Sequence, residues 1–246
     1  MKPCPKCLDR GVIIRENLAY PCSCNKQRAL TNRFRDAGLP EGLRNCTFDQ
    51  FNFKYYSRVK VDPEHKITYY ESARRTYRAA CEFVQKFKEN RQTDGLLITG
   101  PVGSGKTFLA ACMANALLEE GVLLLFVVVP DLLDRLRATY DQSRTGGDYT
   151  ERDLMEAARE VPLLFLDDLG AHNYTEWAKN KIYTILNYRV NHHLPVIITT
   201  NISLEDLSEY LGERTTSRIC QMCRPYRLPV EMDIRILMRR EKTKEL

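Results

Sequence analysis

The sequence predicts an α/β fold of three layers, in which helices cover both faces of a parallel sheet. Helical and strand patterns alternate between residues 46 and 201, as they do in chains that form parallel sheets. The run "VLLLFVVV" at 122–129 is apolar throughout, as expected of a strand that is buried on both faces. A glycine-rich turn joins an apolar strand to a helical stretch within residues 96–118.

The spacing of apolar residues places the individual elements. A first helix at 69–87 carries Ala73, Tyr77, Ala80, Val84 and Phe87 at steps of three and four residues, which puts them on one face. Strands are predicted at 95–100, 122–129, 161–170 and 195–201, with helices between them at 108–120, 130–140 and 177–190. In such a fold, ligands bind at the carboxyl ends of the strands.

Composition divides the chain into two domains. Residues 1–45 are rich in cysteine, and residues 46–246 hold the α/β pattern followed by short helices with a basic end. Residues 1–60 contain 12 Lys and Arg against 5 Asp and Glu, whereas the rest contains 25 against 27. A basic N-terminal segment suits nucleic acid or an acidic protein face, although a solvated surface accounts for it equally well.

Nothing in the sequence predicts a membrane segment. The longest apolar run has eight residues, which is too few to cross a bilayer. The start "MKPCPKC" lacks the apolar core and the cleavage site of a secretion signal. We therefore expect a cytoplasmic protein that has no membrane partner.

The segment "GPVGSGKT" at 100–107 fits the phosphate-binding pattern G-x-x-x-x-G-K-[ST] and lies between a strand and a helix, as that pattern requires. Glycines let successive amides point at phosphate oxygens, and the helix dipole adds to the anion site. Lys106 would reach the terminal phosphates, and the Thr107 hydroxyl would bind Mg²⁺. The predicted nucleotide-binding residues are Gly100, Pro101, Val102, Gly103, Ser104, Gly105, Lys106, Thr107 and Phe108.

Two carboxylates end the strand "LLFLDDLG". Asp167 would hold Mg²⁺, and Asp168 would polarise the attacking water. A strand-end turn or a helix cap is the alternative explanation of an Asp pair. The strand at 122–129 separates the loop strand from the carboxylate strand, which suits the P-loop ATPases that place an extra strand between them.

Polar residues later in the chain extend the site. Thr200 and Asn201 end the strand "PVIITTN", and Asn201 would bond the attacking water or the terminal phosphate; a turn is the alternative. Arg214 and Arg218 lie four residues apart in "GERTTSRI", and we prefer Arg218 as an arginine that acts on a neighbouring subunit. Arg235 would contact the terminal phosphate within its own subunit. Ordinary surface charge is the alternative for the arginines.

In order and wording, these motifs resemble the helicase-loader ATPases of the DnaC/DnaI type, in the AAA+ class. The likeness covers about residues 46–240 and includes "TFDQFNF" at 47–53, "GPVGSGKTFLA", "LLFLDDLGA", "NYRVNHHLPVIITTN" and "GERTTSRI". The transposition-helper ATPases of the IstB type share nearly all of it.

The resemblance implies a role for each matching residue. Residues 100–107 would be the Walker A site, and Asp167 and Asp168 the Walker B pair. Asn201 and Arg235 would be the two sensors, and Arg218 the finger that acts in trans. The AAA+ class usually has Glu in place of Asp168, so we expect weak turnover that suits a switch. The segment at 47–53 would lie near the adenine.

The resemblance also implies partners. Relatives form ATP-dependent homo-oligomers and bind single-stranded DNA on the inner face of a spiral. Four residues between the second and third strands would serve such DNA binding, although a solvated helix and loop is an equal alternative: Arg135, Arg137, Tyr140 and Arg144. Some loaders grip the hexameric replicative helicase through a zinc-containing N-terminal domain, which residues 1–45 would form here.

Four cysteines near the start have the spacing of metal ligands: Cys4, Cys7, Cys22 and Cys24. A hairpin between the two pairs would close a tetrahedral structural zinc site, and metal would stabilise a segment too short to fold unaided. An iron–sulfur cluster and unliganded thiols are the alternatives. A further C-x-x-C, at 220–223, is expected in a helix without a metal role. Cys46, Cys81 and Cys112 are expected in the core.

These observations favour an ATP-switched loader of the replicative DNA helicase, with ATP, Mg²⁺ and Zn²⁺ as cofactors. Three alternatives remain open. The chain would otherwise be an IstB-like transposition helper, a P-loop small-molecule kinase, or an adaptor in which ATP is purely structural.

Overall fold

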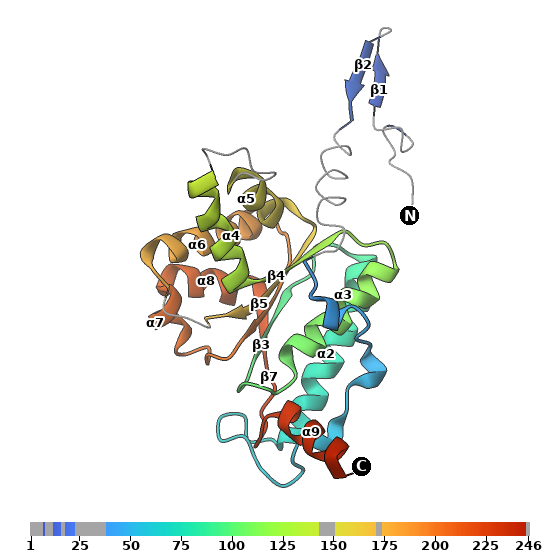
Figure 1. The fold of residues 1–246 in the computed structure, drawn as a ribbon, viewed down its shortest axis with the longest axis vertical. Helices are drawn as coiled ribbons and strands as arrows, with labels where there is room; N and C mark the ends of the chain where they lie inside the picture. Colours follow the sequence, from blue (N-terminus) through green and yellow to red (C-terminus); the bar gives the residue numbers. More distant parts are fainter. Residues whose placement is uncertain are drawn as a thin grey trace.

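The computed structural model describes residue 7 and residues 12–15, 18–22, 38–142, 151–170 and 174–244. The predicted α/β fold is confirmed. Its five-stranded sheet is parallel and has the order β4-β5-β6-β3-β7 (Figure 1). The strands are β3 (Gly95–Thr99), β4 (Leu124–Val128), β5 (Leu163–Leu169), β6 (Val196–Thr200) and β7 (Cys223–Arg227).

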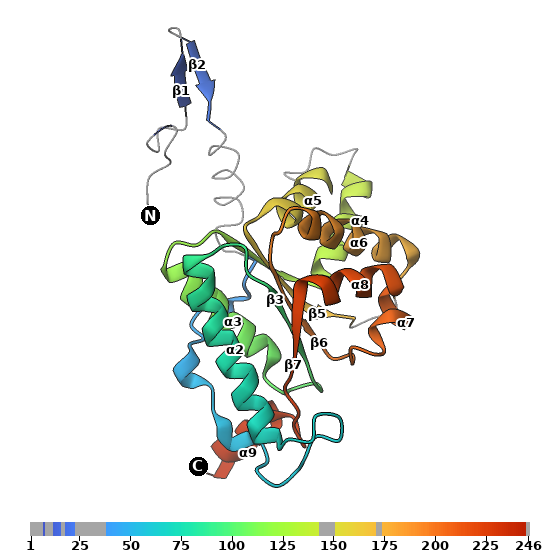
Figure 2. The ribbon, with the colours of Figure 1, turned by 180° about the vertical axis from the view of Figure 1, so that it is seen from behind.

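Helices cover both faces of the sheet, which gives the three predicted layers (Figures 1 and 2). One face is covered by α2 (Tyr69–Glu89) and α3 (Lys106–Glu119). The other is covered by α4 (Val129–Gln142), α5 (Glu151–Glu160), α6 (Glu176–Asn191), α7 (Leu207–Leu211) and α8 (Glu213–Met222). The last helix, α9 (Ile234–Lys244), follows β7. Within residues 38–68, three 3₁₀ turns precede α2: η1 (Glu41–Leu43), η2 (Phe48–Gln50) and η3 (Phe53–Tyr55).

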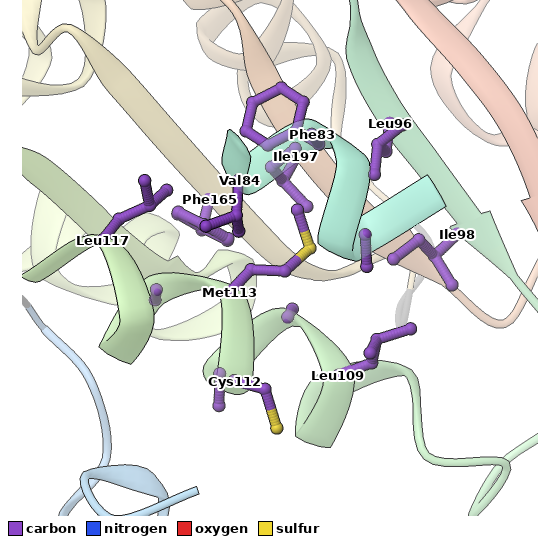
Figure 3. Close-up of a cluster of buried hydrophobic side chains, with 14 of the residues drawn as sticks. Phe83, Val84, Leu96, Ile98, Leu109, Cys112, Met113, Leu117, Phe165 and Ile197 are labelled. Atoms are coloured by element: carbon purple, nitrogen blue, oxygen red, sulfur yellow. The ribbon is translucent and has the colours of Figure 1, made fainter. Parts of the chain in front are cut away.

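Alternation along the strands builds two hydrophobic cores. In β3, Leu96 and Ile98 pack toward α2 and α3, whereas Leu97 packs toward the opposite layer. The same alternation runs through β5, because successive strand residues point to opposite faces. Figure 3 shows the first core, where Met113 of α3 lies between the sheet and α2. Strands buried on both faces, such as β3 and the first part of β5, therefore have to be apolar on both faces, as the sequence indicated.

Two of the three cysteines expected in the core are fully buried. Cys46 is 6% exposed and Cys112 is 1% exposed, whereas Cys81 is only partly buried. Burial raises the pKa of the Cys112 thiol to about 12. These thiols therefore act as small apolar side chains.

The position of the extra strand differs from the prediction. β4 lies at the outer edge of the sheet, and the strand that separates β3 from β5 is β6. Chain order does not give spatial order, because crossover connections can skip positions in a sheet. As a result, the polar end of β6 lies between the phosphate loop and the Asp pair.

A fifth strand, β7, was not predicted, and the expected helix around the late C-x-x-C is only partly correct. Cys220 lies in α8, but Cys223 begins β7. This strand pairs with β3 alone and contains Pro225, which is tolerated at a sheet edge. Its sequence "CRPYR" has no continuous apolar run, so its pairing depends on the tertiary structure. Helix α5 was also missed, although Leu154, Met155, Ala157 and Ala158 have helical spacing.

The connector before the α/β domain is fixed at two places. An ideal Cβ on Gly38 would fall 2.1 Å from the Phe126 carbonyl oxygen, so the chain passes against the outer edge of β4 where only glycine fits. The amide of Asn115, in α3, donates to the carbonyls of Leu43 at 2.8 Å and Cys46 at 2.9 Å. Because Asn115 is only 8% exposed, these bonds tie the connector to the core.

The predicted hairpin between the cysteine pairs is present as β1 (Val12–Arg15) and β2 (Leu18–Pro21), which pair antiparallel. Among the described residues, none of the helices has the length and apolar character that crossing a membrane requires.

Candidate nucleotide-binding site

The phosphate loop connects β3 to α3, as the motif requires. Gly103 and Gly105 have φ values of 72° and 91°, which glycine adopts without strain. Gly105 is the N-cap of α3, so the unpaired amides at the start of the helix border the loop. Ser104 is fully buried, while Val102 at the tip is 58% exposed.

Lys106 lies at the centre of the site. Its ammonium donates to the carbonyls of Gly100 at 2.9 Å and Pro101 at 2.8 Å, and to Oδ1 of Asn201 at 2.6 Å. Burial lowers the pKa of Lys106 to about 8, although nearby Asp168 and Asp167 oppose this effect. The predicted lysine and first sensor residue are therefore in direct contact.

Asp167 is a buried residue of β5. Its Oδ1 accepts from the Thr107 hydroxyl at 2.9 Å and from the Thr199 hydroxyl at 2.5 Å, and the residue is 4% exposed. Burial raises the pKa of Asp167, while the two hydroxyl bonds act in the opposite direction. The Thr107 hydroxyl and this carboxylate are hard oxygen donors side by side, which fits the ligands that Mg²⁺ prefers.

Asp168 lies at an irregular point of β5. Its φ is 59°, and the register between β5 and β6 shifts between Leu166 and Leu169. Its amide donates to the Thr199 hydroxyl at 3.0 Å, and its Oδ1 accepts from Nδ2 of Asn201 at 3.0 Å. This arrangement turns the Asp168 carboxylate toward Asn201 instead of into the sheet.

Sequence analysis missed Thr199. This residue is 1% exposed and bonds to both members of the Asp pair. The polar "TTN" at the end of an apolar strand does indicate site residues, but the prediction named only Thr200 and Asn201. Thr200 instead accepts from the amide of Ile202 at 3.0 Å.

Aromatic residues of the segment before α2 pack against the loop and the start of α3. The Tyr56 hydroxyl donates to the Ser104 carbonyl at 2.7 Å, and the Phe51 and Phe108 ring centroids are 6.4 Å apart. Burial raises the pKa of Tyr56. Phe108 and the segment at 47–53 are therefore neighbours.

Arg235 lies in the first turn of α9. It forms an ion pair with Asp233, in which Nη2 is 2.7 Å from Oδ2. The Asp233 hydrogen bond raises the pKa of Arg235. The start of α9 lies against the phosphate loop, because the amide of Ile234 donates to the Gly103 carbonyl at 3.0 Å, and Arg235 is the next residue.

Arg214 and Arg218 lie elsewhere. Both belong to α8, whose buried residues join the core on the sheet face opposite α3. Nη1 of Arg218 donates to Oε1 of Gln221 at 3.0 Å, and Arg214 is exposed. Among the described contacts, none joins either arginine to the loop or the Asp pair. Any action of Arg218 on a phosphate would therefore involve another subunit.

The proposed DNA-binding residues are described only in part. Arg135 and Arg137 are exposed on α4, and Arg137 lies 5.5 Å from the Trp177 ring centroid. The side chain of Tyr140 and all of Arg144 lie outside the described residues. This prediction remains untested.

The cysteine cluster is also described only in part. Cys7 and Cys22 are 6% and 2% exposed, whereas Cys4 and Cys24 lie outside the described residues. The described residues thus include one buried thiol from each cysteine pair. The zinc site remains a prediction.

A buried lysine in a glycine loop, beside a Thr–Asp pair at the ends of parallel strands, defines a P-loop nucleotide-binding protein. The five-stranded parallel sheet places it in the AAA+ fold. The sequence matches the family of IstB-like ATP binding proteins over residues 23–220, and the chain belongs to this family.

Two of the similar proteins are named as replicative helicase loaders. The chain is 28% identical to the replicative helicase loader DnaI of Bacillus subtilis over 220 residues, which cover 84% of this chain and 64% of DnaI. It therefore spans less than two thirds of that relative. It is 26% identical to the replicative helicase loader DnaC of Escherichia coli K12 over 195 residues, which cover 79% of this chain and 71% of DnaC.

Solved structures agree with the fold. The crystal structure of the DnaC helicase loader matches with a TM-score of 0.61 and 28% identity, over 78% of this chain and all of that one. AMPPCP-bound DnaA from Aquifex aeolicus matches with a TM-score of 0.57 and 20% identity, over 84% of this chain and 56% of that one, which shows the fold alone.

Proposed function

We propose that the protein is an ATP-dependent loader of a replicative DNA helicase, in which slow ATP hydrolysis acts as a switch. The ATPase part of the proposal rests on hydrogen bonds between side chains at the ends of three strands, β3, β5 and β6. Lys106 after β3 bonds to Asn201 after β6, and Thr107 bonds to Asp167 of β5. The loader part rests on the names of the DnaI and DnaC relatives.

The residues would divide the work as follows. The amides of the loop and the Lys106 ammonium bind the phosphates, and Thr107 and Asp167 hold the metal. Bound Mg²⁺ would neutralise charge on the terminal phosphates. Asp168 and Asn201 share a hydrogen bond, so they would orient one water together. Asp is shorter than the usual Glu, which favours slow turnover over the rate of a motor.

Hydrolysis would be completed across a subunit boundary. Arg218 lies away from the site of its own chain, so we assign it to the site of a neighbouring copy in an ATP-dependent homo-oligomer. Arg218→Ala should retain ATP binding and lose hydrolysis that is stimulated by DNA or helicase. Arg214→Ala, one turn earlier on α8, is the matched control. Full stimulation in the Arg218 variant would contradict the trans role.

The remaining parts of the proposal concern partners. Cys4, Cys7, Cys22 and Cys24 would bind one structural zinc, and residues 1–45 would contact the helicase. Arg135, Arg137, Tyr140 and Arg144 would bind single-stranded DNA. Metal analysis of the purified chain tests the first point: one zinc per chain is expected, and its loss is expected in Cys7→Ser.

Co-purification with a hexameric replicative helicase, with and without ATP, tests the whole proposal. ATP-dependent association is expected for the wild type and not for Lys106→Ala. A transposition helper is the second candidate, because the matching family is named for IstB. The same assay with a transposase in place of the helicase separates the two functions. The kinase alternative receives no support from these relatives.

A further inference from the structure

A carboxylate lies directly against the phosphate loop from outside the predicted motifs. An ideal Cβ on Gly103 would fall 2.0 Å from both Cγ and Oδ1 of Asp233, and Gly103 has a φ of 72°. The amide of Ile234 donates to the Gly103 carbonyl at 3.0 Å. The turn before α9 is therefore packed on the loop, with a negative charge at the contact.

The same carboxylate holds the Arg235 guanidinium. Nε of Arg235 lies 3.1 Å and 3.3 Å from the two carboxylate oxygens of Asp233, and Nη2 lies 2.7 Å from Oδ2. The Asp233 side chain is 20% exposed and that of Arg235 is 70% exposed. The pKa of Asp233 is lowered, chiefly by the hydrogen bonds from Arg235. Asp233 is therefore ionised and occupies the fork that Arg235 would offer to a phosphate.

We propose that Asp233 is a specificity-determining residue that makes the nucleotide site distinguish ATP from ADP. It competes with the terminal phosphate of ATP for the Arg235 guanidinium. The proposal rests on the proposed function, in that it requires a nucleotide to bind at the loop. It adds a residue that the phosphate-loop, Asp-pair and sensor motifs do not include.

The exchange of partners follows from the chemistry of the guanidinium group. A carboxylate and a phosphate both accept two parallel hydrogen bonds from arginine, so the third phosphate of ATP competes with Asp233. ADP lacks that phosphate and leaves Arg235 paired. Since Asp233 and Arg235 flank the start of α9, the exchange would alter the contact between α9 and the loop in the ATP complex only.

Asp233 also caps α9, and this structural role has to be kept separate. Its Oδ1 accepts from the amide of Arg235 at 2.8 Å. Asparagine caps helices about as well as aspartate, so Asp233→Asn retains the cap and removes the charge. Glu231→Gln is the matched control, because Glu231 is an exposed carboxylate two residues away whose ion-pair partner is Lys60, at 3.5 Å.

Calorimetric titration of the full chain with ATP and with ADP, both with Mg²⁺, tests the proposal. Asp233→Asn should bind ATP about three- to fivefold more tightly than the wild type, as expected when a partly exposed ion pair no longer competes. Its affinity for ADP should change less than about twofold, and Glu231→Gln should match the wild type. When Arg235 is also replaced by alanine, Asp233→Asn should increase the affinity for ATP by less than about twofold, because the two residues act together.

The outcomes separate this proposal from the proposed function. Suppose that the wild type binds ATP. If Asp233→Asn does not increase the affinity for ATP, or increases the affinities for ATP and ADP equally, the role of Asp233 is refuted while ATP binding stands. An undiminished gain in the Arg235→Ala background would also refute it. If the wild type binds neither nucleotide, the proposed function fails and this proposal fails with it.

Discussion

Replacing Thr199 with valine should impair Mg²⁺ binding while leaving the shape of the side chain nearly unchanged. The Thr199 hydroxyl donates to Oδ1 of Asp167 at 2.5 Å and accepts from the Asp168 amide at 3.0 Å. Valine has no hydroxyl, so Asp167 keeps only the bond from Thr107. Burial already raises the pKa of Asp167, and loss of the Thr199 bond would raise it further.

The size of the effect follows from the charge on the acceptor. A hydrogen bond to an ionised group contributes about 1.5–3 kcal/mol. This equals about a ten- to hundredfold change in an equilibrium constant, which is also the usual effect of removing a group that orients a metal ligand. We therefore expect the affinity for Mg²⁺ in the ATP complex to fall about ten- to hundredfold. The loss should be larger at acidic pH, because the carboxylate with the raised pKa binds a proton in competition with the metal.

Calorimetry with ATP, performed with added Mg²⁺ and with a chelator, measures the effect. Thr199→Val should bind metal-free ATP within about twofold of the wild type and lose the gain that Mg²⁺ provides. Thr200→Val is the matched control, since Thr200 is equally buried on β6 but bonds to the Ile202 amide. If Thr199→Val keeps the Mg²⁺ dependence of the wild type, Asp167 does not hold the metal as proposed.

Three further predictions concern Lys106, Asn115 and Tyr56. Lys106 is charged below its pKa of about 8, so its contribution to ATP affinity should be constant at lower pH, and ATP affinity should fall by up to about tenfold per pH unit above this pKa. A flat profile in ATP titrations above this pKa would contradict the reasoning. Asn115→Leu removes the side-chain donor from two connector carbonyls, of which the Leu43 carbonyl keeps the Cys46 amide at 3.3 Å, and should lower the free energy of unfolding by about 1–3 kcal/mol in urea denaturation. Asn191→Leu on the exposed end of α6 should change it by less than about 0.5 kcal/mol. Tyr56→Phe removes the buried hydrogen bond to the loop and should lower the free energy of unfolding by about 1–2 kcal/mol in urea denaturation. Tyr55→Phe should lower it much less, because the Tyr55 hydroxyl bonds to an exposed carboxylate, and equal losses in the two variants would contradict this reasoning.

Much of the fold could be predicted because its signals are local. The apolar runs give β3, β4, β5 and β6, and the glycine loop followed by Lys106 and Thr107 marks the phosphate site. Each signal lies within a few adjacent residues, whose backbone geometry and burial it specifies directly. The Asp pair and Asn201 could be predicted for the same reason, since the carboxyl ends of parallel strands lie at one edge of the sheet.

The rest depends on neighbours that are distant in sequence. β7 forms because β3 offers a free edge, and β6, not β4, comes to lie between the loop and the Asp pair. That placement gives Thr199 its bonds to residues 31 and 32 positions earlier, and it brings Asn201 to Lys106 across 95 positions.

The sequence by itself determined that this chain has a phosphate loop, a carboxylate pair and an alternating α/β core. The tertiary structure alone decided the contact of Asp233 with Gly103, the pairing of Asp233 with Arg235 and the placement of Arg218 on the far layer. The physical reason is that local patterns record backbone geometry and burial, whereas the partner of a charge is set by how the sheet is ordered.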